Sequence, residues 1–134
     1  MRWLIKNQIF KVDDISTISY DPQDLDFDIL IMTIYGDKFT IACNSLEERN
    51  EKLHFIEEAN KDYNCDLAYV SNGNYINMNH VTHINYYKDT LDNKKVWVLG
   101  ITWSSLRRLP ESFILDSNIY TTEEDVKFLF ESLV

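Results

Sequence analysis

The segment Asn72–Tyr87, which reads NGNYINMNHVTHINYY, decides the fold because an earlier part of the chain repeats its pattern. A shift of 66 positions places Lys6–Tyr20 on Asn72–Tyr86. Six apolar positions then coincide: Ile9, Phe10, Val12, Ile15, Ile18 and Tyr20 fall on Tyr75, Ile76, Met78, Val81, Ile84 and Tyr86. A repeat at fixed spacing is typical of proteins built from similar supersecondary units. We therefore divide the chain into a first unit, residues 1–66, and a second unit, residues 67–134.

Each unit begins with a predicted β-hairpin. The paired strands are Arg2–Ile5 with Gln8–Val12 in the first unit, and Leu67–Val70 with Tyr75–Asn79 in the second. The dipeptide Asn72-Gly73 favours a type I′ turn in the second hairpin, because both residues accept a positive φ. Apolar residues at a spacing of three follow each hairpin. The polar pairs Asp13-Asp14 and Asn79-His80 indicate a bulge or bend in the strand that begins there.

The remaining patterns predict further strands and one helix in each unit. In the first unit these are a strand over Asp28–Tyr35, a return strand over Lys38–Cys43, and a helix opened by Ser45 with Glu48 as its capping box. In the second unit they are a strand over Lys94–Ile101, an insertion over Trp103–Ser117 whose Ser112–Leu115 portion is an extra strand or a covering loop, and a helix opened by Thr121 with Glu124.

These elements predict an α+β fold. It consists of two tandem β-hairpin/β/β/α units of mainly antiparallel sheet, and one helix closes each unit. A unit of this length alone buries only a marginal core. We therefore expect both units to share a core across a pseudo-twofold axis and to pack as one compact domain over residues 1–134.

The chain is acidic, with a net charge of −9 and a pI of about 4.7. Residues 1–66 hold fourteen Asp and Glu against seven Lys and Arg, whereas residues 67–134 hold eight against six. This balance argues against direct nucleic-acid binding through a basic face. An acidic first unit suits a protein partner with a basic surface, although acidic side chains also keep a small protein soluble.

Several features indicate a cytoplasmic protein. No segment reaches the roughly 18 apolar residues of a membrane-spanning helix, and the first residues form too short an apolar run for a secretory signal. Cys43 and Cys65 are not clustered, which suits a reducing compartment. The richness in Asn, Ile, Lys and Tyr is typical of AT-rich bacterial or phage genomes.

No motif of known chemistry is present. His80 and His83 would lie on opposite faces of an extended segment, and no third ligand stands at a zinc-site spacing. The Asp-rich run over residues 21–28 lacks the glycine and the final glutamate of an EF-hand. There is no nucleophile elbow and no phosphate-binding glycine loop. We therefore predict no catalytic residue, no metal and no cofactor. An enzyme of unrecognised type is the alternative, since carboxylates distant in the sequence can meet in space for acid–base work.

The first candidate partner-binding segment is the polar loop that carries Asp21, Asp24, Asp26 and Asp28. Four carboxylates in one short loop suit electrostatic capture of a basic partner. The alternative is a solvated loop without a partner.

The second candidate segment is the insertion, which contains Trp103, Arg107 and Arg108. Trp and Arg are enriched at binding hot spots, and the planar guanidinium recognises carboxylates and phosphates. In the alternative interpretation, Trp103 packs on the sheet and the arginines pair with the acidic unit.

From these observations we expect a non-catalytic acidic binding protein. In its concrete form it is an inhibitor or antagonist that masks a basic surface of a partner protein, as immunity proteins and phage anti-defence proteins do. One alternative is a module that sequesters a small molecule or nucleotide, with Arg107 or Arg108 on its phosphate. A second alternative is a structural module that forms a homodimer or larger homo-oligomer through an exposed sheet edge.

Overall fold

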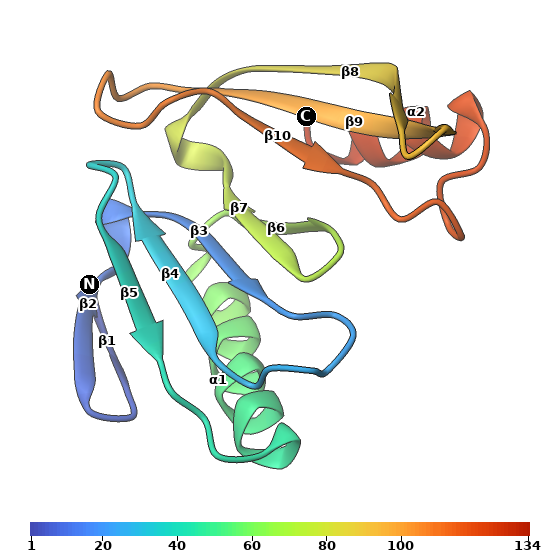
Figure 1. The fold of residues 1–134 in the computed structure, drawn as a ribbon. Helices are drawn as coiled ribbons and strands as arrows, with labels where there is room; N and C mark the ends of the chain where they lie inside the picture. Colours follow the sequence, from blue (N-terminus) through green and yellow to red (C-terminus); the bar gives the residue numbers. More distant parts are fainter.

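Ten β-strands and two α-helices make up the computed structural model, which describes all 134 residues (Figure 1). The strands are β1 (Arg2–Ile5), β2 (Gln8–Lys11), β3 (Ile15–Tyr20), β4 (Ile29–Thr33), β5 (Lys38–Ile41), β6 (Leu67–Ser71), β7 (Asn74–Asn77), β8 (Val81–Leu91), β9 (Lys94–Trp103) and β10 (Glu111–Ile114). The helices are α1 (Leu46–Tyr63) and α2 (Glu123–Ser132). The fold is thus α+β and compact. Neither helix combines the length and the apolar character needed to cross a bilayer.

The same order of elements runs along both halves of the chain: a hairpin, a short 3₁₀ turn, three strands and an α-helix. The 3₁₀ turns cover Val12–Asp14 and Met78–His80. They occupy the predicted bends and account for the first interval of three between apolar residues, Val12 to Ile15 and Met78 to Val81. The next interval of three lies in a strand whose register shifts, between Ile15 and Thr17 in β3 and between Val81 and His83 in β8. The Asn72-Gly73 turn has positive φ at both residues, 52° and 78°, as a type I′ turn requires.

The strands of the two halves do not pair equivalently. The first hairpin, β1 with β2, forms a sheet of its own, whereas the second hairpin joins the sheet of the first half in the order β5-β4-β3-β7-β6. The third sheet has the order β10-β9-β8 and belongs to the second half. The strands that pair between the halves are β3 and β7, which run antiparallel, with Thr17 opposite Ile76 and Ser19 opposite Asn74.

Two separate hydrophobic clusters form instead of the single shared core that we expected. The first contains fifteen buried residues, almost all from the first half, and α1 covers it with Leu53, Ile56 and Ala59. The second contains nine buried residues, and α2 covers it with Val126 and Leu129. The β6–β7 hairpin contributes to both clusters, because successive side chains of a strand point to opposite faces.

Some predicted boundaries differ from those of the structure. The strands predicted over Asp28–Tyr35 and Lys38–Cys43 are shorter, the strand predicted over Lys94–Ile101 continues to Trp103, and the predicted extra strand is β10. Helix α2 begins one residue later than predicted. Its N-cap is Thr122, which forms a capping box with Asp125 in place of Thr121 with Glu124. The predicted N-cap Ser45 accepts the Glu48 N–H at 3.1 Å, but the Glu48 carboxylate accepts the N–H of Asn44.

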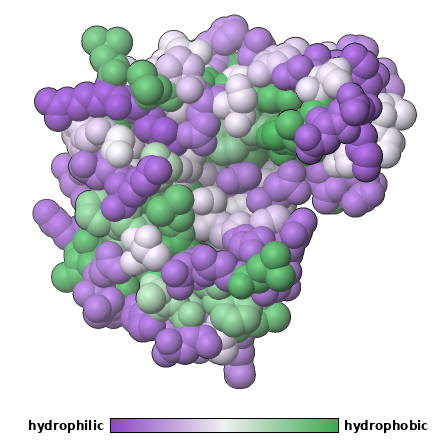
Figure 2. Space-filling view, in the orientation of Figure 1, coloured by the Kyte–Doolittle hydropathy of each residue, from purple (hydrophilic) through white to green (hydrophobic).

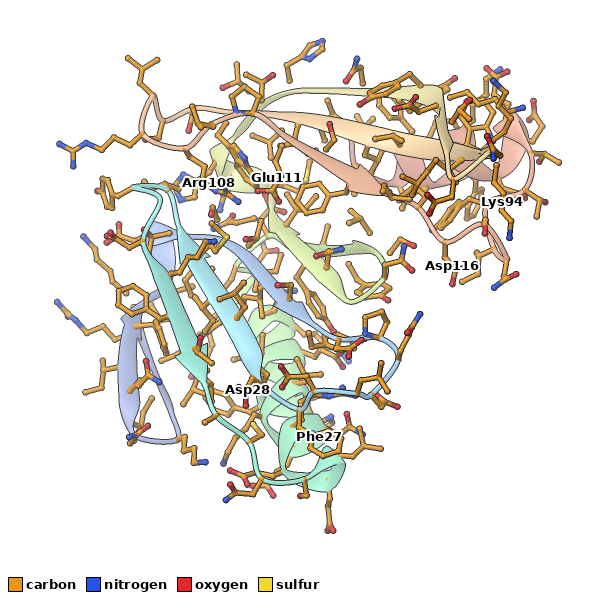
Figure 3. All side chains as sticks on the ribbon, in the orientation of Figure 1. Phe27, Asp28, Lys94, Arg108, Glu111 and Asp116 are labelled. Carbon is orange, nitrogen blue, oxygen red and sulfur yellow. The ribbon has the colours of Figure 1, made fainter.

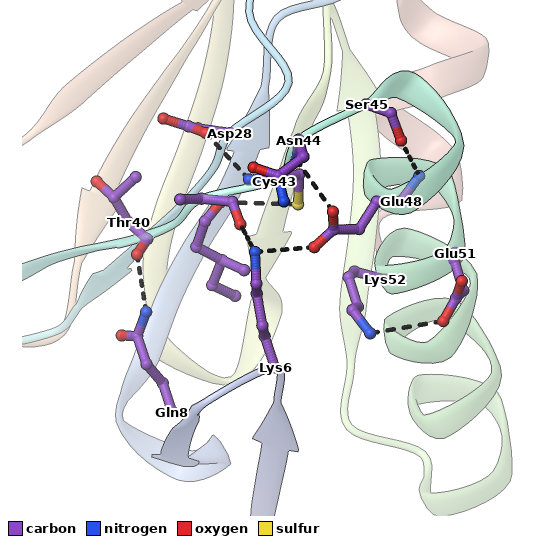
Figure 4. Close-up of polar contacts among 12 residues, drawn as sticks. Lys6, Gln8, Asp28, Thr40, Cys43, Asn44, Ser45, Glu48, Glu51 and Lys52 are labelled. Carbon is purple, nitrogen blue, oxygen red and sulfur yellow. Dashed lines mark hydrogen bonds and ion pairs between the residues drawn. The ribbon is translucent and has the colours of Figure 1, made fainter.

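The β1–β2 hairpin covers the outer edge of β5 with side chains (Figure 4). Gln8 Nε2 donates to the Thr40 carbonyl at 2.8 Å, and the Lys6 ammonium donates to the Ala42 carbonyl. Lys6 also forms an ion pair with Glu48 at 2.8 Å. The hairpin therefore occupies the acceptors of an edge strand without extending the sheet, which protects that edge from pairing with other strands.

The turn glycine Gly73 provides a test of the β3–β7 junction. A Cβ at Gly73 would lie 2.3 Å from the Tyr20 carbonyl oxygen, and the φ of Gly73 is +78°. Because both strain and a backbone clash result, we expect Gly73→Ala to lower the free energy of unfolding by about 3 kcal/mol. Gly36→Ala is the matched control, since Gly36 also has a positive φ but its nearest neighbour would lie at 3.2 Å. We expect that change to cost only about 1 kcal/mol in urea denaturation. Equal losses for both variants would contradict the tight junction.

Candidate functional site

The loop between β3 and β4, residues 21–28, is folded by its own carboxylates. Asp21 accepts the backbone N–H groups of Gln23 at 2.9 Å, Leu25 at 3.1 Å and Asp26 at 3.2 Å. Such side-chain-to-backbone bonds are typical of Asx turns. We call this segment the acidic loop. Its conformation exists before any partner arrives, so binding does not have to order it.

The other three aspartates of the acidic loop differ in their availability. Asp28 Oδ1 accepts the Cys43 N–H at 3.2 Å and so ties the loop to the segment after β5. Asp26 Oδ1 accepts the Asp28 N–H at 2.9 Å. Asp24 and Asp26 are nevertheless exposed, whereas Asp21 and Asp28 are half-buried. The charges that a partner would meet first are therefore those of Asp24 and Asp26.

Arg49 of α1 holds the acidic loop against the helix. Its side chain is only 4% exposed and forms an ion pair with Asp24 at 2.8 Å. The same guanidinium donates to the Asp21 carbonyl at 3.0 Å and lies over the Tyr20 ring, with 4.7 Å between Cζ and the centroid. We did not single out Arg49 from the sequence. Its position on the apolar stripe, three residues after Leu46 and four before Leu53, is the signal that marks a buried cation.

An open basin lined with tyrosines adjoins the acidic loop at the end of β3. Its walls are formed by Tyr20, Glu57, Asn60, Leu67, Tyr69 and Tyr75. The Tyr69 and Tyr75 rings meet edge to face with centroids 5.2 Å apart, and the Tyr20 and Tyr75 centroids are 6.5 Å apart. Tyr69 is about half exposed, whereas Tyr75 is buried. We call this feature the tyrosine basin.

The polar groups of the tyrosine basin give it one net negative charge. Burial and a hydrogen bond with Tyr69 raise the pKa of Tyr20 to about 12. Burial and the hydrogen bond to Glu57 raise the pKa of Tyr75 above its ordinary value. Both phenols are therefore neutral at neutral pH. The Tyr75 hydroxyl donates to Glu57 Oε1 and leaves the other carboxylate oxygen without a protein donor. Aromatic rings beside a carboxylate form a suitable site for a cationic side chain.

Trp103 and Arg108, predicted to meet a partner, lie inside the protein. Trp103 is 5% exposed and belongs to the second hydrophobic cluster. Arg108 is 8% exposed and lies over the Trp103 ring with 5.3 Å from Cζ to the centroid. Its Nε donates to Ser16 Oγ of β3 at 3.3 Å, and its Nη2 pairs with Glu111 (Figure 3). Arg108 thus bonds to β3 of the first half, Trp103 belongs to the core of the second half, and neither offers an exposed side chain to a partner.

The exposed part of the insertion consists of other residues. Leu106 is fully exposed at 101%, Leu109 is also exposed, and the Arg107 guanidinium lies 5.7 Å from the Tyr35 ring centroid. Figure 2 shows a hydrophobic projection at the upper left, where the segment between β9 and β10 lies in Figure 1. The apolar group that stands out from this segment is thus leucine and not tryptophan.

The two predicted segments are not brought together. The acidic loop precedes β4, whereas the insertion contacts the turn after β4, where a Cβ on Gly36 would lie 3.2 Å from the Arg107 carbonyl. Asp28 and Arg108 accordingly lie at opposite ends of this strand (Figure 3). The residue set that does converge with the acidic loop is the tyrosine basin, because Tyr20 is covalently followed by Asp21.

A second hollow brings together residue types that occur in catalytic sites. Cys65, His80 and Asp13 are among the residues that line it. The Cys65 sulfur, however, lies near Met1 Sδ at 3.9 Å, and the His80 ring contacts the Asp13 carbonyl. Burial raises the pKa of the Cys65 thiol, which disfavours the reactive thiolate. The structure contains no group of three or more His, Cys, Asp or Glu side chains arranged to hold a metal ion.

The acidic loop and the tyrosine basin together form the candidate site. Tyr20 of the basin directly precedes the loop, Arg49 contacts both, and both are negative. No protein-family model matches the chain, and no curated protein or solved structure gives a significant match. Function is therefore argued from the residues of this surface.

The raised pKa of Tyr20 predicts a change of stability in alkali. A proton that the folded state holds more tightly stabilises the fold fully below the ordinary tyrosine pKa of about 10. We expect the free energy of unfolding to fall as the pH rises from there toward the Tyr20 pKa of about 12. Tyr69→Phe removes the hydrogen bond that raises this pKa, so the late ionisation should shift toward neutral pH. The ultraviolet absorbance of the phenolate, recorded against pH, measures this ionisation. Tyr63→Phe, at an exposed tyrosine outside the basin, is the control. Titration of every tyrosine near the ordinary value would contradict this environment.

Proposed function

We propose that this chain is a non-catalytic acidic binding protein that masks a basic surface of a partner protein. The observation that carries the proposal is the juxtaposition of the acidic loop, folded in advance, with the tyrosine basin and its free carboxylate oxygen. An inhibitor or antagonist of a basic enzyme or complex, of the immunity-protein or phage anti-defence kind, needs such a surface.

Binding begins with long-range electrostatics. The net charge of −9 attracts a basic partner and speeds the encounter. Asp24, which Arg49 restrains, and Asp26 then face the partner. An arginine or lysine side chain of the partner enters the tyrosine basin, where the Tyr69 ring and the Glu57 carboxylate contact it. Tyrosine supplies a large contact area at low cost in conformational entropy.

In this proposal the tyrosine basin takes the contact role that the sequence suggested for Trp103, which is buried. Sequestration of a nucleotide draws less support, because Arg108 is paired with Glu111 inside the protein. Arg107 lies on the side of Tyr35, away from the tyrosine basin. No convergent pair of cations is therefore available for a phosphate next to the aromatic rings.

We further propose that the two halves are versions of one ancestral unit within a single domain. The strands β2 and β7 and the two 3₁₀ turns occur at the same positions in the two halves once the spacing of 66 residues is applied. The proposed site, with Tyr20 from one half and Tyr69 and Tyr75 from the other, depends on both halves. Two free cysteines, Cys43 and Cys65, suit a cytoplasmic location.

Removal of charge from the acidic loop tests the capture step. The double change Asp24→Asn and Asp26→Asn keeps oxygen acceptors for the loop but removes two charges, one of which pairs with the buried Arg49. Thermal unfolding of the variant therefore accompanies the binding measurement, to separate lost capture from a loosened loop. We expect it to weaken binding of a partner isolated from bacterial lysate at low salt at least about tenfold. The matched control, Glu124→Gln with Glu131→Gln on α2, removes the same charge from the second half and should change affinity little. Isothermal titration at two salt concentrations measures both. Equal weakening by both variants would mean that net charge, and not this loop, attracts the partner.

A change at Tyr69 tests the basin independently of charge. Tyr69→Ala removes the exposed ring, and we expect affinity for the same partner to fall by about tenfold or more, as at a binding hot spot. Tyr63→Ala removes another exposed tyrosine and serves as the control. Thermal unfolding of both variants separates lost binding from lost stability. Unchanged affinity in the Tyr69 variant would remove the basin from the interface.

A further inference from the structure

Strand β8 is a long edge strand with nothing on its outer side. It spans eleven residues and pairs only with β9. In Figure 1 it forms the upper border of the molecule, with no element beyond it. An unpaired edge of this length presents a row of free backbone donors and acceptors.

The turn between β8 and β9 determines which backbone groups are free. Asp92 and Asn93 both have positive φ, 49° and 64°, which defines a two-residue type I′ turn. The residues that flank this turn, Leu91 and Lys94, form a hydrogen-bonded pair, and such pairs alternate along an antiparallel ladder. The backbone groups of Ile84, Tyr86, Lys88 and Thr90 therefore point outward. Strand β9 shows the same alternation. Trp97 lies opposite Lys88, and its carbonyl points away from β8 and accepts the Leu115 N–H at 2.9 Å.

The two edges of the five-stranded sheet, β5 and β6, are covered, and the edge of β8 is not. The edge of β5 is covered by Gln8 and Lys6. The edge of β6 lies against the chain after β10, where the Asp116 N–H donates to Ser71 Oγ at 2.9 Å. On β8 there is no proline, and the register shift lies at its very start, between Val81 and His83. Its one lysine, Lys88, lies over its own Trp97 ring at 5.3 Å.

We propose that a second copy of this chain pairs with β8 through its own β8, antiparallel, about a twofold axis. The register with complete overlap places Tyr86 of each copy at the axis and aligns all eleven residues. The two three-stranded sheets then form one continuous sheet of six strands. Such an isologous contact closes on itself and does not lead to fibres.

The charges of β8 favour this register. It places His83 of each copy opposite Asp89 of the other, where an imidazole N–H can donate to the carboxylate. Lys88 faces Ile84, so no like charges are directly opposed. A shift of the axis to Lys88 would place that lysine opposite itself. The β8–β9 hairpin, with three lysines and two aspartates, carries +1 in a chain of net −9, so the hairpin itself does not share the acidic excess of the chain.

The proposed dimer is independent of the proposed function and leaves its site free. The acidic loop and the tyrosine basin belong to the five-stranded sheet, whereas β8 belongs to the other sheet. A dimer would therefore carry two copies of the partner-binding surface. Two linked surfaces raise the apparent affinity for a partner that displays its basic site twice.

A proline on the outward side of β8 tests the pairing. Lys88→Pro removes an outward N–H and leaves the bonds to β9 in place, since proline is tolerated on an edge where the N–H faces solvent. Lys88→Ala is the control, because it keeps the N–H. Sedimentation velocity of the full chain should show a dimer for the wild type and Lys88→Ala. For Lys88→Pro we expect a monomer, or dissociation at concentrations at least about tenfold higher. A wild-type monomer, or a dimer that survives the proline, would overturn the proposal.

A charge exchange tests the register without any proline, in case Lys88→Pro does not fold. His83→Asp opposes two pairs of carboxylates in the dimer and should weaken it. The added change Asp89→Lys pairs each new carboxylate with an ammonium and should restore the dimer. Near-ultraviolet circular dichroism confirms that each variant is folded. If the second change fails to restore the dimer, β8 does not pair with itself in this register. If binding of another protein and not self-association responds to these changes, the occupant of the edge is not a second copy.

Discussion

The antiparallel pairing of β3 with β7 is the contact on which the rest of the structure depends. It is short, but the Tyr20 N–H donates to the Gly73 carbonyl at 3.0 Å and the Asn77 side chain donates to the Ile15 carbonyl at 2.8 Å. Tyr75 of β7 packs into the first hydrophobic cluster, and its neighbour Ile76 packs into the second. One strand thus supplies both cores, and the halves cannot separate without opening both.

This contact also creates the candidate site. Because β3 ends beside the Asn72-Gly73 turn, Tyr20 meets Tyr69 and Tyr75, which lie far from it in the chain. The acidic loop begins at the next residue, and Arg49 binds both the loop and the Tyr20 ring. The negative surface is therefore built on a junction between the halves and not on either half alone. A partner that binds there contacts both.

Local signals in the sequence predicted the local structure. Asn72-Gly73 predicted its turn because few dipeptides accept two positive φ values, and Ser45 predicted a helix start because its hydroxyl accepts a free N–H. The α+β class and nearly all strands followed from such patterns. The pairing of β3 with β7 did not, because hydrogen bonds between distant strands leave no local trace in composition. The expected shared core failed for the same reason.

The site was predicted in part. The acidic loop was visible as a run of aspartates, but the tyrosines of the basin alternate along ordinary strands and carry no signal of their convergence. Trp and Arg are residue types enriched at binding hot spots. Trp103 and Arg108 are nevertheless buried, so their side chains pack inside the protein and not against a partner. Arg49 was recognisable in principle, since a cation on an apolar helix stripe has to find partners inside the protein.

The two hydrophobic clusters each contain one buried tryptophan, Trp3 in the first and Trp103 in the second. Neither indole N–H has a hydrogen-bond partner in the protein. Each cluster therefore has its own fluorescent reporter in an apolar setting. Versions of the chain that retain only one of these indoles, with the partly buried Trp97 also replaced, would show whether the halves melt as one cooperative body or in sequence. Tryptophan fluorescence can therefore follow the unfolding of each hydrophobic cluster separately.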